Sequence, residues 1–313
     1  MTISFVATVF NEEKTIAKLL ESLILQSRLS DEIIIVDGGS TDKTKEIILK
    51  FIKYYKDKAI RLLIKKGNRS IGRNEGIKNA KGDIILSSDA GCILDKNWIR
   101  NIITPFSDPN VDVVAGYYKG LPKSVFQKCL IPYVLVMPDK VNPKHFLPAS
   151  RTMAFRKKIW EKVGGFPKEY SHNEDYVFAK KLQAINACTI FAGDAIVYWM
   201  PRKNLSEVFV MFFRFAFGDA QAEIFRPKVY LVFARYIVGF GLVGLYVGVH
   251  TMKLFVTLIL LVFAYLVWSV MKNYKYVRDW KAIVILPIIQ ITADVAVMSG
   301  VLTAFHQKIW DIQ

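Results

Sequence analysis

Three long apolar stretches toward the C-terminal end constrain the fold of this chain more than any other feature of its sequence. They cover residues 229–249, 254–271 and 282–305. A helix of roughly 20 apolar residues crosses the hydrocarbon core of a bilayer, so each stretch is long enough to span a membrane. From residue 228 onward the chain carries only 8 of its 43 basic and 3 of its 27 acidic residues. We therefore expect a transmembrane region at 228–313 with about three helices.

Two charged residues interrupt these stretches. Arg235 lies near one end of the first stretch, where its long side chain can reach the headgroup region. Asp294 lies in the middle of the third, where we expect it to face a neighbouring helix or a cavity. Buried helices of a soluble domain are the alternative interpretation, and a re-entrant third segment is another.

The basic residues of the short connections predict the orientation of the helices. The connection before residue 282 is rich in them, with Lys272, Lys275, Arg278 and Lys281. The connection after residue 249 is poorer in Lys and Arg. Because Lys and Arg are retained on the cytoplasmic side, the richer connection and the large N-terminal part are both expected in the cytoplasm. We predict a multi-pass protein of the cell membrane.

Composition and cysteine usage narrow the function classes. The formal net charge of +16 fits anionic lipid headgroups, and no segment resembles a nucleic-acid recognition module, so we expect no nucleic-acid partner. Cys92, Cys129 and Cys188 are scattered without a CxxC pair, which indicates neither a zinc site nor a disulfide framework. The first apolar run lacks a basic leader, so it predicts a strand rather than a secretory signal.

Short apolar runs alternate with helical patterns over the first 120 residues. Strands are predicted at ISFVATVF, EIIIVD, IRLLI and DIILSS, with amphipathic segments between them. This order predicts an α/β fold with a mostly parallel, doubly wound sheet. Ligands of such folds bind outside the carboxyl ends of the strands. Three strands deliver a carboxylate to that edge, namely Glu12, Asp37 and Asp89.

The segment 204–227 has a pattern of its own, rich in Phe with a few charges and too polar to span a bilayer. It predicts an amphipathic helix that lies in the membrane interface. This helix would join a domain at 1–203 to the transmembrane region.

Several chemistries have no motif in this chain. There is no GxGxxG after the first strand and no GxxxxGK[ST], so neither a Rossmann dinucleotide site nor a P-loop is indicated. The four histidines stand in no Ser/His/Asp order with a nucleophile elbow, which argues against acyl transfer. Glycoside hydrolysis by paired carboxylates stays open, although the fold pattern and the expected cytoplasmic side disfavour it.

Five motifs in series form a distinctive pattern over roughly residues 1–200. They are FVATVFNEE, EIIIVDGGSTDKT, SIGRNEGIKNAKGDIILSSDAGC, FRKKIWEKVGGF and NEDYVFAKKL. In this order and spacing they resemble the family 2 glycosyltransferases of the GT-A fold. The segments PASRTMAF and FRFAFGDA further resemble family members with C-terminal membrane helices. The resemblance implies a GT-A nucleotide-diphospho-sugar transferase domain at 1–203, followed by an α-helical transmembrane region.

The resemblance also implies residues that bind the nucleotide sugar. Phe10, Glu12 and Asp37 match the positions that hold the nucleobase and ribose, and Arg73 matches the basic residue that faces the nucleotide. Asp89 matches the first acid of the family's DxD motif, which binds the sugar nucleotide and a divalent cation, Mg²⁺ or Mn²⁺. Such a cation stabilises the negative charge that builds on the departing diphosphate.

The ED pair at the start of the last motif implies the catalytic carboxylate. Asp175 matches the general base that takes the proton from the acceptor hydroxyl, with Glu174 beside it. A single displacement with such a base inverts the anomeric centre. Structural roles compete with these functional ones, because Glu174 and Asp175 also suit the N-terminus of a helix and Asp37 also suits a turn.

The chain departs from the family pattern in two places. Gly91 stands where the second DxD acid is expected, so water, diphosphate oxygens or another side chain must complete a cation site. The histidine that many relatives carry near the end of the domain is absent, and His172 is a weak substitute. Arg151 is a weak candidate for contact with phosphate or acceptor, with a surface ion pair as its alternative. No QxxRW of processive polymerases is present, which argues for one sugar per encounter.

The membrane helices point to a membrane-associated acceptor, such as a polyprenyl phosphate or a lipid-linked saccharide. If the acceptor were an ionised phosphate, a general base would be dispensable, and Asp175 would orient the acceptor or cation instead. A second interpretation is a catalytically impaired, transferase-like membrane protein that binds nucleotide sugar or a partner. Gly91 favours it, and the ED pair opposes it. A transporter is a third interpretation, although three spans are few for one.

Overall fold

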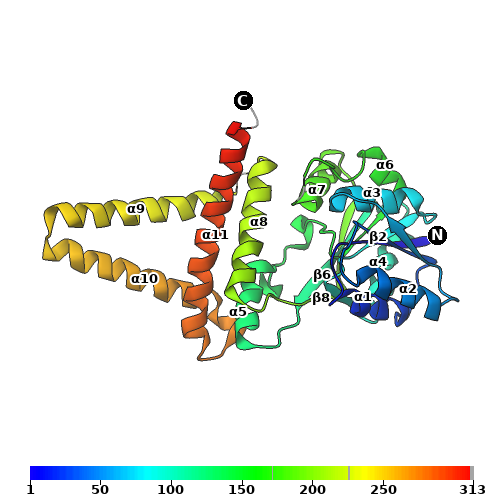
Figure 1. Ribbon diagram of the computed structural model, residues 1–313, viewed down its shortest axis with the longest axis horizontal. Coiled ribbons are helices and arrows are strands. Elements are labelled where there is room, and N and C mark those ends of the chain that lie inside the picture. Colours follow the sequence, from blue (N-terminus) through cyan, green and yellow to red (C-terminus); the bar gives the residue numbers. More distant parts are fainter. Residues whose placement is uncertain (171, 225, 311–313) are drawn as a thin grey trace. The chain divides into compact units, whose positions relative to one another are not determined.

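The computed structural model describes residues 1–170, 172–224 and 226–310. Positions 225 and 311–313, which the predicted interfacial helix and transmembrane region include, lie outside the described residues. The chain divides into two compact units, shown in Figure 1. The first unit comprises Met1–Leu121 and Val136–Met200, and the second comprises Pro122–Leu135 and Pro201–Gln313. Residues 122–135 therefore group with the C-terminal helices.

Within the described residues, the first unit holds an eight-stranded sheet with helices on both faces. The strands are β1 (Ile3–Val9), β2 (Glu32–Asp37), β3 (Ile60–Ile64), β4 (Ile84–Ser87), β5 (Cys92–Leu94), β6 (Val113–Gly120), β7 (Met153–Arg156) and β8 (Thr189–Trp199). The helices are α1 (Ile16–Ile24), α2 (Thr44–Tyr54), α3 (Arg69–Asn79), α4 (Trp98–Ile103), α6 (Lys157–Lys162) and α7 (Glu174–Ala184). Short 3-10 turns lie at Thr104–Ser107, Pro138–Lys140 and Pro143–His145.

The sheet is mixed, with the strand order β3-β2-β1-β4-β7-β6-β8-β5. Its first four strands are parallel, as the alternation of strands and helices predicts. Strand β7 runs antiparallel to both β4 and β6, and β5 runs antiparallel to β8, whereas β6 and β8 are parallel. The carboxyl ends of β1, β2 and β4 therefore share one edge of the sheet.

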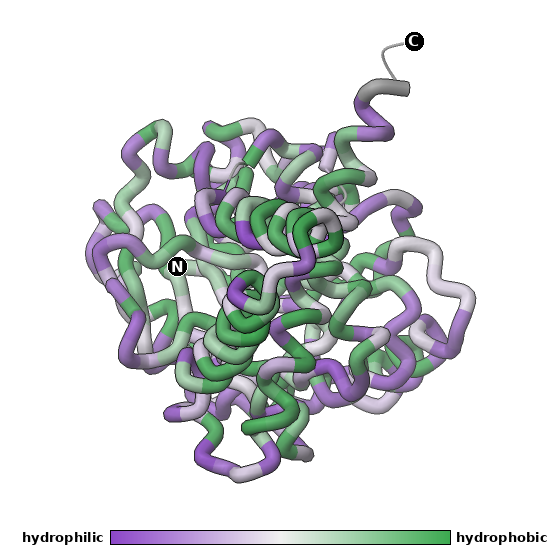
Figure 2. The backbone as a smooth tube through the Cα atoms, turned by 90° about the vertical axis from the view of Figure 1, so that its left-hand side faces the viewer, coloured by the Kyte–Doolittle hydropathy of each residue, from purple (hydrophilic) through white to green (hydrophobic). Residues whose placement is uncertain are grey.

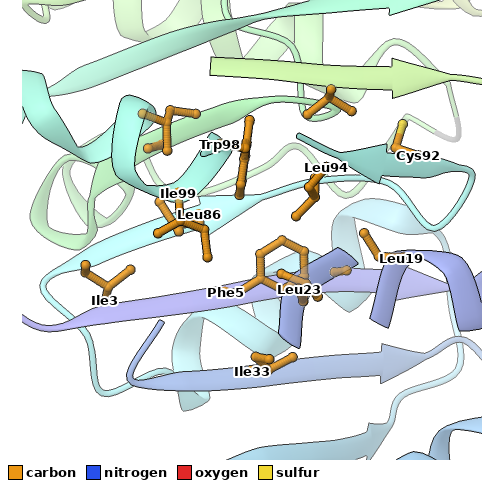
Figure 3. Close-up of a cluster of buried hydrophobic side chains, with 14 of the residues drawn as sticks. Ile3, Phe5, Leu19, Leu23, Ile33, Leu86, Cys92, Leu94, Trp98 and Ile99 are labelled. Atoms are coloured by element: carbon orange, nitrogen blue, oxygen red, sulfur yellow. The ribbon is translucent and has the colours of Figure 1, made fainter. Parts of the chain in front are cut away.

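Two apolar clusters cover the two faces of this sheet, because alternate side chains of each strand point to opposite sides. On one face, shown in Figure 3, Phe5 meets Trp98 edge to face, with ring centroids 6.2 Å apart. On the other, Phe166 stacks on Phe178 with ring centroids 4.1 Å apart. Burial on both faces confirms the doubly wound arrangement expected from the continuous apolar strands.

The second unit consists of helices. They are α5 (Val125–Val134), α8 (Leu205–Gln221), α9 (Pro227–Val249), α10 (Met252–Val277) and α11 (Ala282–Trp310). Figure 1 shows α8 lying along α11, and α9 and α10 forming a hairpin that projects away from this pair. Among the described residues, α9, α10 and α11 are long and apolar enough to cross a membrane.

These three helices differ in how much protein covers them. The most apolar window of α9 has no buried residues, that of α10 is 6% buried, and that of α11 is 39% buried. Figure 2, where α9 and α10 point toward the viewer, colours both helices mainly as hydrophobic. The hairpin therefore presents apolar side chains outward, as lipid-facing helices do, whereas α11 also serves as packing surface for α8.

Candidate active site

The edge where β1, β2 and β4 end gathers the predicted nucleotide-binding residues. Strand register pairs Val9 with Asp37 and Val6 with Ser87, so the three strands finish side by side. The predicted residues at or just beyond these ends are Phe10, Glu12, Asp37 and Asp89.

Asp37 closes β2 with one carboxylate oxygen bonded and the other without a partner. Its Oδ1 accepts hydrogen bonds from the backbone N–H groups of Gly39, at 2.7 Å, and Ser40, at 2.6 Å. Gly39 has a φ of +99°, which favours glycine and allows the chain to fold back over the carboxylate. Within the described residues, the buried Oδ2 has no hydrogen-bond partner. An unsatisfied acceptor of this kind suits a donor group on a ligand.

The end of β1 offers an exposed aromatic ring beside a glycine. Phe10 is 59% exposed, and its Cδ2 lies 3.6 Å from the position that a Cβ on Gly38 would take. The Glu12 carboxylate accepts a hydrogen bond from the Thr15 hydroxyl, and its backbone N–H donates to Thr44 Oγ1 at 2.7 Å. Phe10 therefore has a free face for stacking, whereas Glu12 is held by its own loop.

Close packing of α3 on the sheet sets the position of Arg73. Gly72 and Gly76 face β1, where an added Cβ would lie 2.8 Å from Thr8 Cγ2 or 2.5 Å from Val6 Cγ1. Only glycine permits so short a distance between helix and strand. The approach brings the Arg73 guanidinium to the strand ends, where its side chain is 3% exposed.

Arg73 links the strand-end acid to the ED pair. Its Nη1 donates to Glu174 Oε1 at 2.6 Å, and its Nη2 donates to Asp89 Oδ1 at 3.0 Å and to Ser150 Oγ at 2.9 Å. Glu174 lies 101 residues away along the chain, and its side chain is 4% exposed. The fold therefore brings together three residues that the sequence analysis singled out separately.

The pKa values of Asp89 and Asp175 are shifted in opposite directions. Burial opposes the charge of Asp89, but Arg73, Arg151 and Arg69 outweigh it and hold the pKa of Asp89 below its ordinary value. Burial, together with the negative charge of Glu174, raises the pKa of Asp175 above its ordinary value. Asp89 is thus suited to remain ionised, and Asp175 is suited to take up a proton.

Ser150 connects these two carboxylates. Its backbone N–H donates to Asp175 Oδ2 at 3.3 Å, and its hydroxyl lies 3.5 Å from Asp89 Oδ1. The Asp175 Oδ1 also accepts from the backbone N–H of Tyr176 at 2.8 Å. These hydrogen bonds fix the orientation of the Asp175 carboxylate relative to Asp89.

Arg151 lies at the same cluster, near two aromatic rings. Its Cζ is 5.3 Å from the ring centroid of Tyr118 and 5.7 Å from that of Trp199. Its Nε is buried and has no hydrogen-bond partner among the described residues. Because its charge helps to lower the pKa of Asp89, Arg151 belongs to the electrostatics of this site.

Spacing along the chain did not indicate three members of the cluster. Ser150, Tyr118 and Trp199 come from separate segments, and a hint existed only for Ser150, which adjoins Arg151 in PASRTMAF. His172 lies two residues before Glu174 and is partly exposed. Its contact with an acceptor stays a prediction.

The protein groups at Asp89 fit a divalent cation only as part of a larger ligand set. Asp89 is 38% exposed, and one of its oxygens already accepts from Arg73. No group of three or more His, Cys, Asp or Glu side chains within the described ranges is arranged to hold a metal. A Cβ added at Gly91 would meet nothing within 4 Å, so space remains beside Asp89. Diphosphate oxygens or water would have to supply the other ligands.

Comparison with known proteins shows the family to which the chain belongs. A family model described as glycosyl transferase family 2 matches residues 4–162, just over half of the chain. Glycosyltransferase AglE from Haloferax volcanii is 24% identical over 249 residues, which cover 76% of this chain and 81% of AglE.

A second relative and a solved structure extend the comparison. The dolichyl N-acetyl-alpha-D-glucosaminyl phosphate 3-beta-D-2,3-diacetamido-2,3-dideoxy-beta-D-glucuronosyltransferase of Methanococcus voltae is 35% identical over 131 residues, covering 39% of this chain and 41% of that protein. This chain therefore spans less than half of that relative. The mannosyltransferase PcManGT from Pyrobaculum calidifontis, solved in complex with GDP-Man and Mn²⁺, is 18% identical with a TM-score of 0.65, covering 95% of this chain and 86% of that one. This last likeness shows the GT-A fold.

Proposed function

The chain belongs to glycosyl transferase family 2, and on this basis we propose that it is an inverting glycosyltransferase. It moves a sugar from a nucleotide-diphospho-sugar to a membrane-associated acceptor, one sugar per encounter. The observation that carries the proposal is the pairing of an ionised Asp89 with a proton-accepting Asp175 around the buried Arg73.

The donor nucleotide binds along the ends of β1 and β2. The unpartnered Asp37 Oδ2 accepts a hydrogen bond from the nucleobase or ribose, and the exposed face of Phe10 stacks on the base. Glu12 holds the loop after β1 in position for the nucleotide through its hydrogen bonds with Thr15 and Thr44. PcManGT, a GT-A neighbour, was solved with GDP-Man, which supports a donor of the nucleotide-diphospho-sugar class.

The diphosphate lies at Asp89. Asp89 would hold a Mg²⁺ or Mn²⁺ ion, which would supply positive charge to the departing diphosphate. The Arg151 guanidinium, whose Nε has no protein partner within the described residues, faces the same negative charge. Arg73 fixes Glu174, Asp89 and Ser150 with three of its five N–H donors, and its Nε, which has no partner within the described residues, stays available to the nucleotide.

Asp175 removes the proton from the acceptor hydroxyl as that oxygen attacks the anomeric carbon. The bond to the new oxygen forms as the bond to the diphosphate breaks, and the proton passes to the Asp175 carboxylate. The raised pKa of Asp175 supports this role, since a stronger base accepts a proton more readily. Glu174, which is held by Arg73, positions its neighbour and does not itself take the proton.

The acceptor is a polyprenyl phosphate or a lipid-linked saccharide. Three apolar helices and the name of the Methanococcus voltae relative, which includes a dolichyl-linked sugar phosphate, support a lipid-held acceptor. The chain is multi-pass and keeps the transferase unit on the cytoplasmic side, as the basic connection around Lys275 supports. Thiol labelling tests this side, because Cys188 is exposed whereas Cys92 and Cys129 are buried. Labelling of Cys188 from outside intact cells would contradict the cytoplasmic orientation.

Replacing Asp175 by Asn tests the assignment of the base. We expect turnover on a hydroxyl acceptor to fall by about 10²–10⁴-fold, the usual contribution of a general base, with nucleotide-sugar binding retained. On a phosphate acceptor, which is already ionised, the loss would be much smaller. Asp194→Asn, at an exposed position of β8, is the matched control. An unchanged rate of Asp175→Asn on every acceptor would remove the base assignment.

Gly91 favours a second candidate, a transferase-like membrane protein without catalysis that binds nucleotide sugar or a partner. Titration of the purified protein with several nucleotide sugars, with and without Mn²⁺, separates the two together with a transfer assay. Binding with no transfer to any lipid acceptor would support the second candidate. Absence of binding under both conditions would exclude the transferase.

A further inference from the structure

A polar cluster lies among the apolar helices α9, α10 and α11 of the second unit. Its members come from α9, α10 and α11 and are Arg235, Tyr265, Trp268, Lys272, Gln290 and Asp294. Neither the proposed transfer reaction nor the family resemblance uses this cluster.

The Asp294 carboxylate at the centre of the cluster is saturated with donors. Its Oδ2 accepts from Arg235 Nη2 at 2.5 Å and from the Tyr265 hydroxyl at 2.7 Å. Its Oδ1 accepts from Gln290 Nε2 at 2.9 Å. The side chain is 3% exposed, so these bonds satisfy a buried charge. Asp294 therefore joins the helices, and its hydrogen bond with Arg235 involves only the Nη2 group of that side chain.

Arg235 keeps capacity for a second anion. Its side chain is 33% exposed, and its Nε is buried without a hydrogen-bond partner in the part of the chain that the structure describes. The guanidinium has five N–H donors in a planar fork that matches phosphate oxygens. A mainly apolar helix thus presents a cation to its surroundings.

Lys272 presents a second cation beside the same indole ring. Its Nζ lies 5.0 Å from the Trp268 ring centroid, and the Arg235 Cζ lies 5.4 Å from it. Lys272 is exposed, and Tyr133 of α5 also lies under its ammonium, at 5.1 Å. Two reachable cations flanked by Trp and Tyr rings are the composition of a headgroup-level site, where aromatic rings have one apolar and one polar side.

From this arrangement we propose that the Arg235–Lys272 face of the polar cluster binds the phosphate of an anionic membrane lipid. Basic pockets between membrane helices recognise lipid phosphates by this chemistry. Both a bilayer phospholipid and a polyprenyl phosphate acceptor carry such a group. The inference does not rest on the transfer reaction.

Lipid titration of the purified full-length protein tests the site and distinguishes the two sources. The probes are phosphatidylglycerol, a polyprenyl phosphate and zwitterionic phosphatidylcholine, with bound lipid counted by native mass spectrometry. We expect Lys272→Met to weaken binding of an anionic lipid about fivefold, the contribution of one basic residue near the membrane surface. Lys275→Met is the matched control, since it removes the same charge one turn further along α10, where Nζ lies over Tyr276.

The source of the phosphate follows from the ranking of the probes. Tighter binding of polyprenyl phosphate than of phosphatidylglycerol assigns the site to the acceptor, and equal binding assigns it to bilayer lipid. Binding of both no better than phosphatidylcholine overturns the proposal. Equal weakening by Lys272→Met and Lys275→Met overturns it as well, because the effect would then be a general surface charge.

Charge variants at Asp294 separate lipid binding from a purely structural ion pair. Asp294→Asn frees the Arg235 guanidinium, so anionic lipid should bind about fivefold more tightly. The double variant Arg235→Met with Asp294→Asn leaves no unpaired buried charge, and lipid should then bind more weakly than to the unmodified protein. A structural pair without a ligand predicts no such opposite changes. Nucleotide-sugar binding, measured on the same samples, should stay unchanged, so failure here is distinct from failure of the transferase proposal.

Discussion

Each of the two units of this protein contains a polar centre, and the two centres are built around side chains of opposite charge. In the first unit a single buried arginine, Arg73, serves the carboxylates of Glu174 and Asp89, and Asp175 beside them keeps a raised pKa. In the second unit a single buried carboxylate, Asp294, collects donors from Arg235 and from neutral side chains. In the first centre one guanidinium joins two carboxylates, and in the second one carboxylate joins donors from three helices.

Burial decides what each centre contributes to stability. The Arg73 side chain is 3% exposed, whereas the Arg235 side chain is 33% exposed. Removing one partner of a fully buried ion pair leaves an uncompensated charge, while a partly exposed pair is screened by its surroundings. The comparison therefore predicts a larger loss of stability in the first unit.

The largest expected effect comes from Arg73→Met. It leaves Glu174 buried without its cation, so we expect the free energy of unfolding of the first unit to fall by about 3–5 kcal/mol. Hydrogen exchange of the β4 and β7 amides measures this loss in the first unit alone. Arg61→Met is the control, because Arg61 pairs with Glu32 at 2.6 Å but its side chain is 40% exposed. That control should cost about 1 kcal/mol or less; equal losses would break the burial argument.

The next effect tests whether the second unit depends on helix packing rather than on charge. A Cβ at Gly300 of α11 would lie 2.4 Å from the backbone oxygen of Phe213 in α8. Gly300→Ala must therefore push the two helices apart, and we expect a loss of about 1–3 kcal/mol in thermal or denaturant unfolding of the second unit.

Gly239→Ala is the matched control for this substitution. Gly239 lies in α9, and a Cβ there would meet nothing within 4 Å. Alanine should then stabilise the helix by about 0.5–1 kcal/mol, because glycine has the poorer helix propensity. A stable Gly300→Ala variant would show that α8 and α11 are not held at close contact.

Much of the first unit could be predicted from local pattern, because parallel strands end at a common edge. That rule alone is enough to bring Asp37 and Asp89 to the same edge of the sheet. A strand at Thr152–Phe155 could be expected from its residues, and β7 forms there at Met153–Arg156, but four residues carry no signal of the partner or direction of the strand. Its antiparallel direction, which makes the sheet mixed, follows from tertiary pairing.

The contacts inside the site were less predictable than its members. The motif resemblance named Arg73 and Glu174 separately, but their 2.6 Å ion pair joins residues 101 apart and has no local signature. The same holds for the contacts of Arg151 with the rings of Tyr118, in β6, and Trp199, in β8. In the second unit, Asp294 was expected to face a neighbouring helix, and it meets Arg235 of α9. The identity of that partner required the fold.

A smaller effect distinguishes Asp175 from Asp89 in their contributions to the stability of the first unit. The pKa of Asp175 is raised, so the folded state binds its proton more tightly than the unfolded chain, and ionisation at pH 7 destabilises the fold. Asp175→Asn should therefore stabilise the first unit at pH 7 by about 0.5–2 kcal/mol, as substitutions at functional positions often do. The gain should shrink as pH falls through the folded pKa of Asp175 toward its ordinary value.

Asp89→Asn should change stability in the opposite direction. Because the pKa of Asp89 is lowered, its charge stabilises the fold above its ordinary pKa, and this contribution is lost as pH falls through the folded pKa. Denaturant unfolding of both variants between pH 4 and pH 8 checks the two signs. Destabilisation by both substitutions at pH 7 would mean that folding does not raise the pKa of Asp175.

The smallest expected effect comes from placing a second carboxylate beside Asp89. Gly91 has open space around it and no positive φ, so Gly91→Asp should fold and place a second carboxylate near Asp89. If a divalent cation binds at Asp89, the new ligand should tighten Mn²⁺ binding about fivefold, the contribution of a partly solvated charge pair. Titration calorimetry with Mn²⁺ in the presence of a nucleoside diphosphate measures this change. Gly91→Ala, which adds bulk without charge, should leave the affinity unchanged. Weaker Mn²⁺ binding in Gly91→Asp would instead mean that the arginines around Asp89, and not a cation, provide the positive charge for the diphosphate.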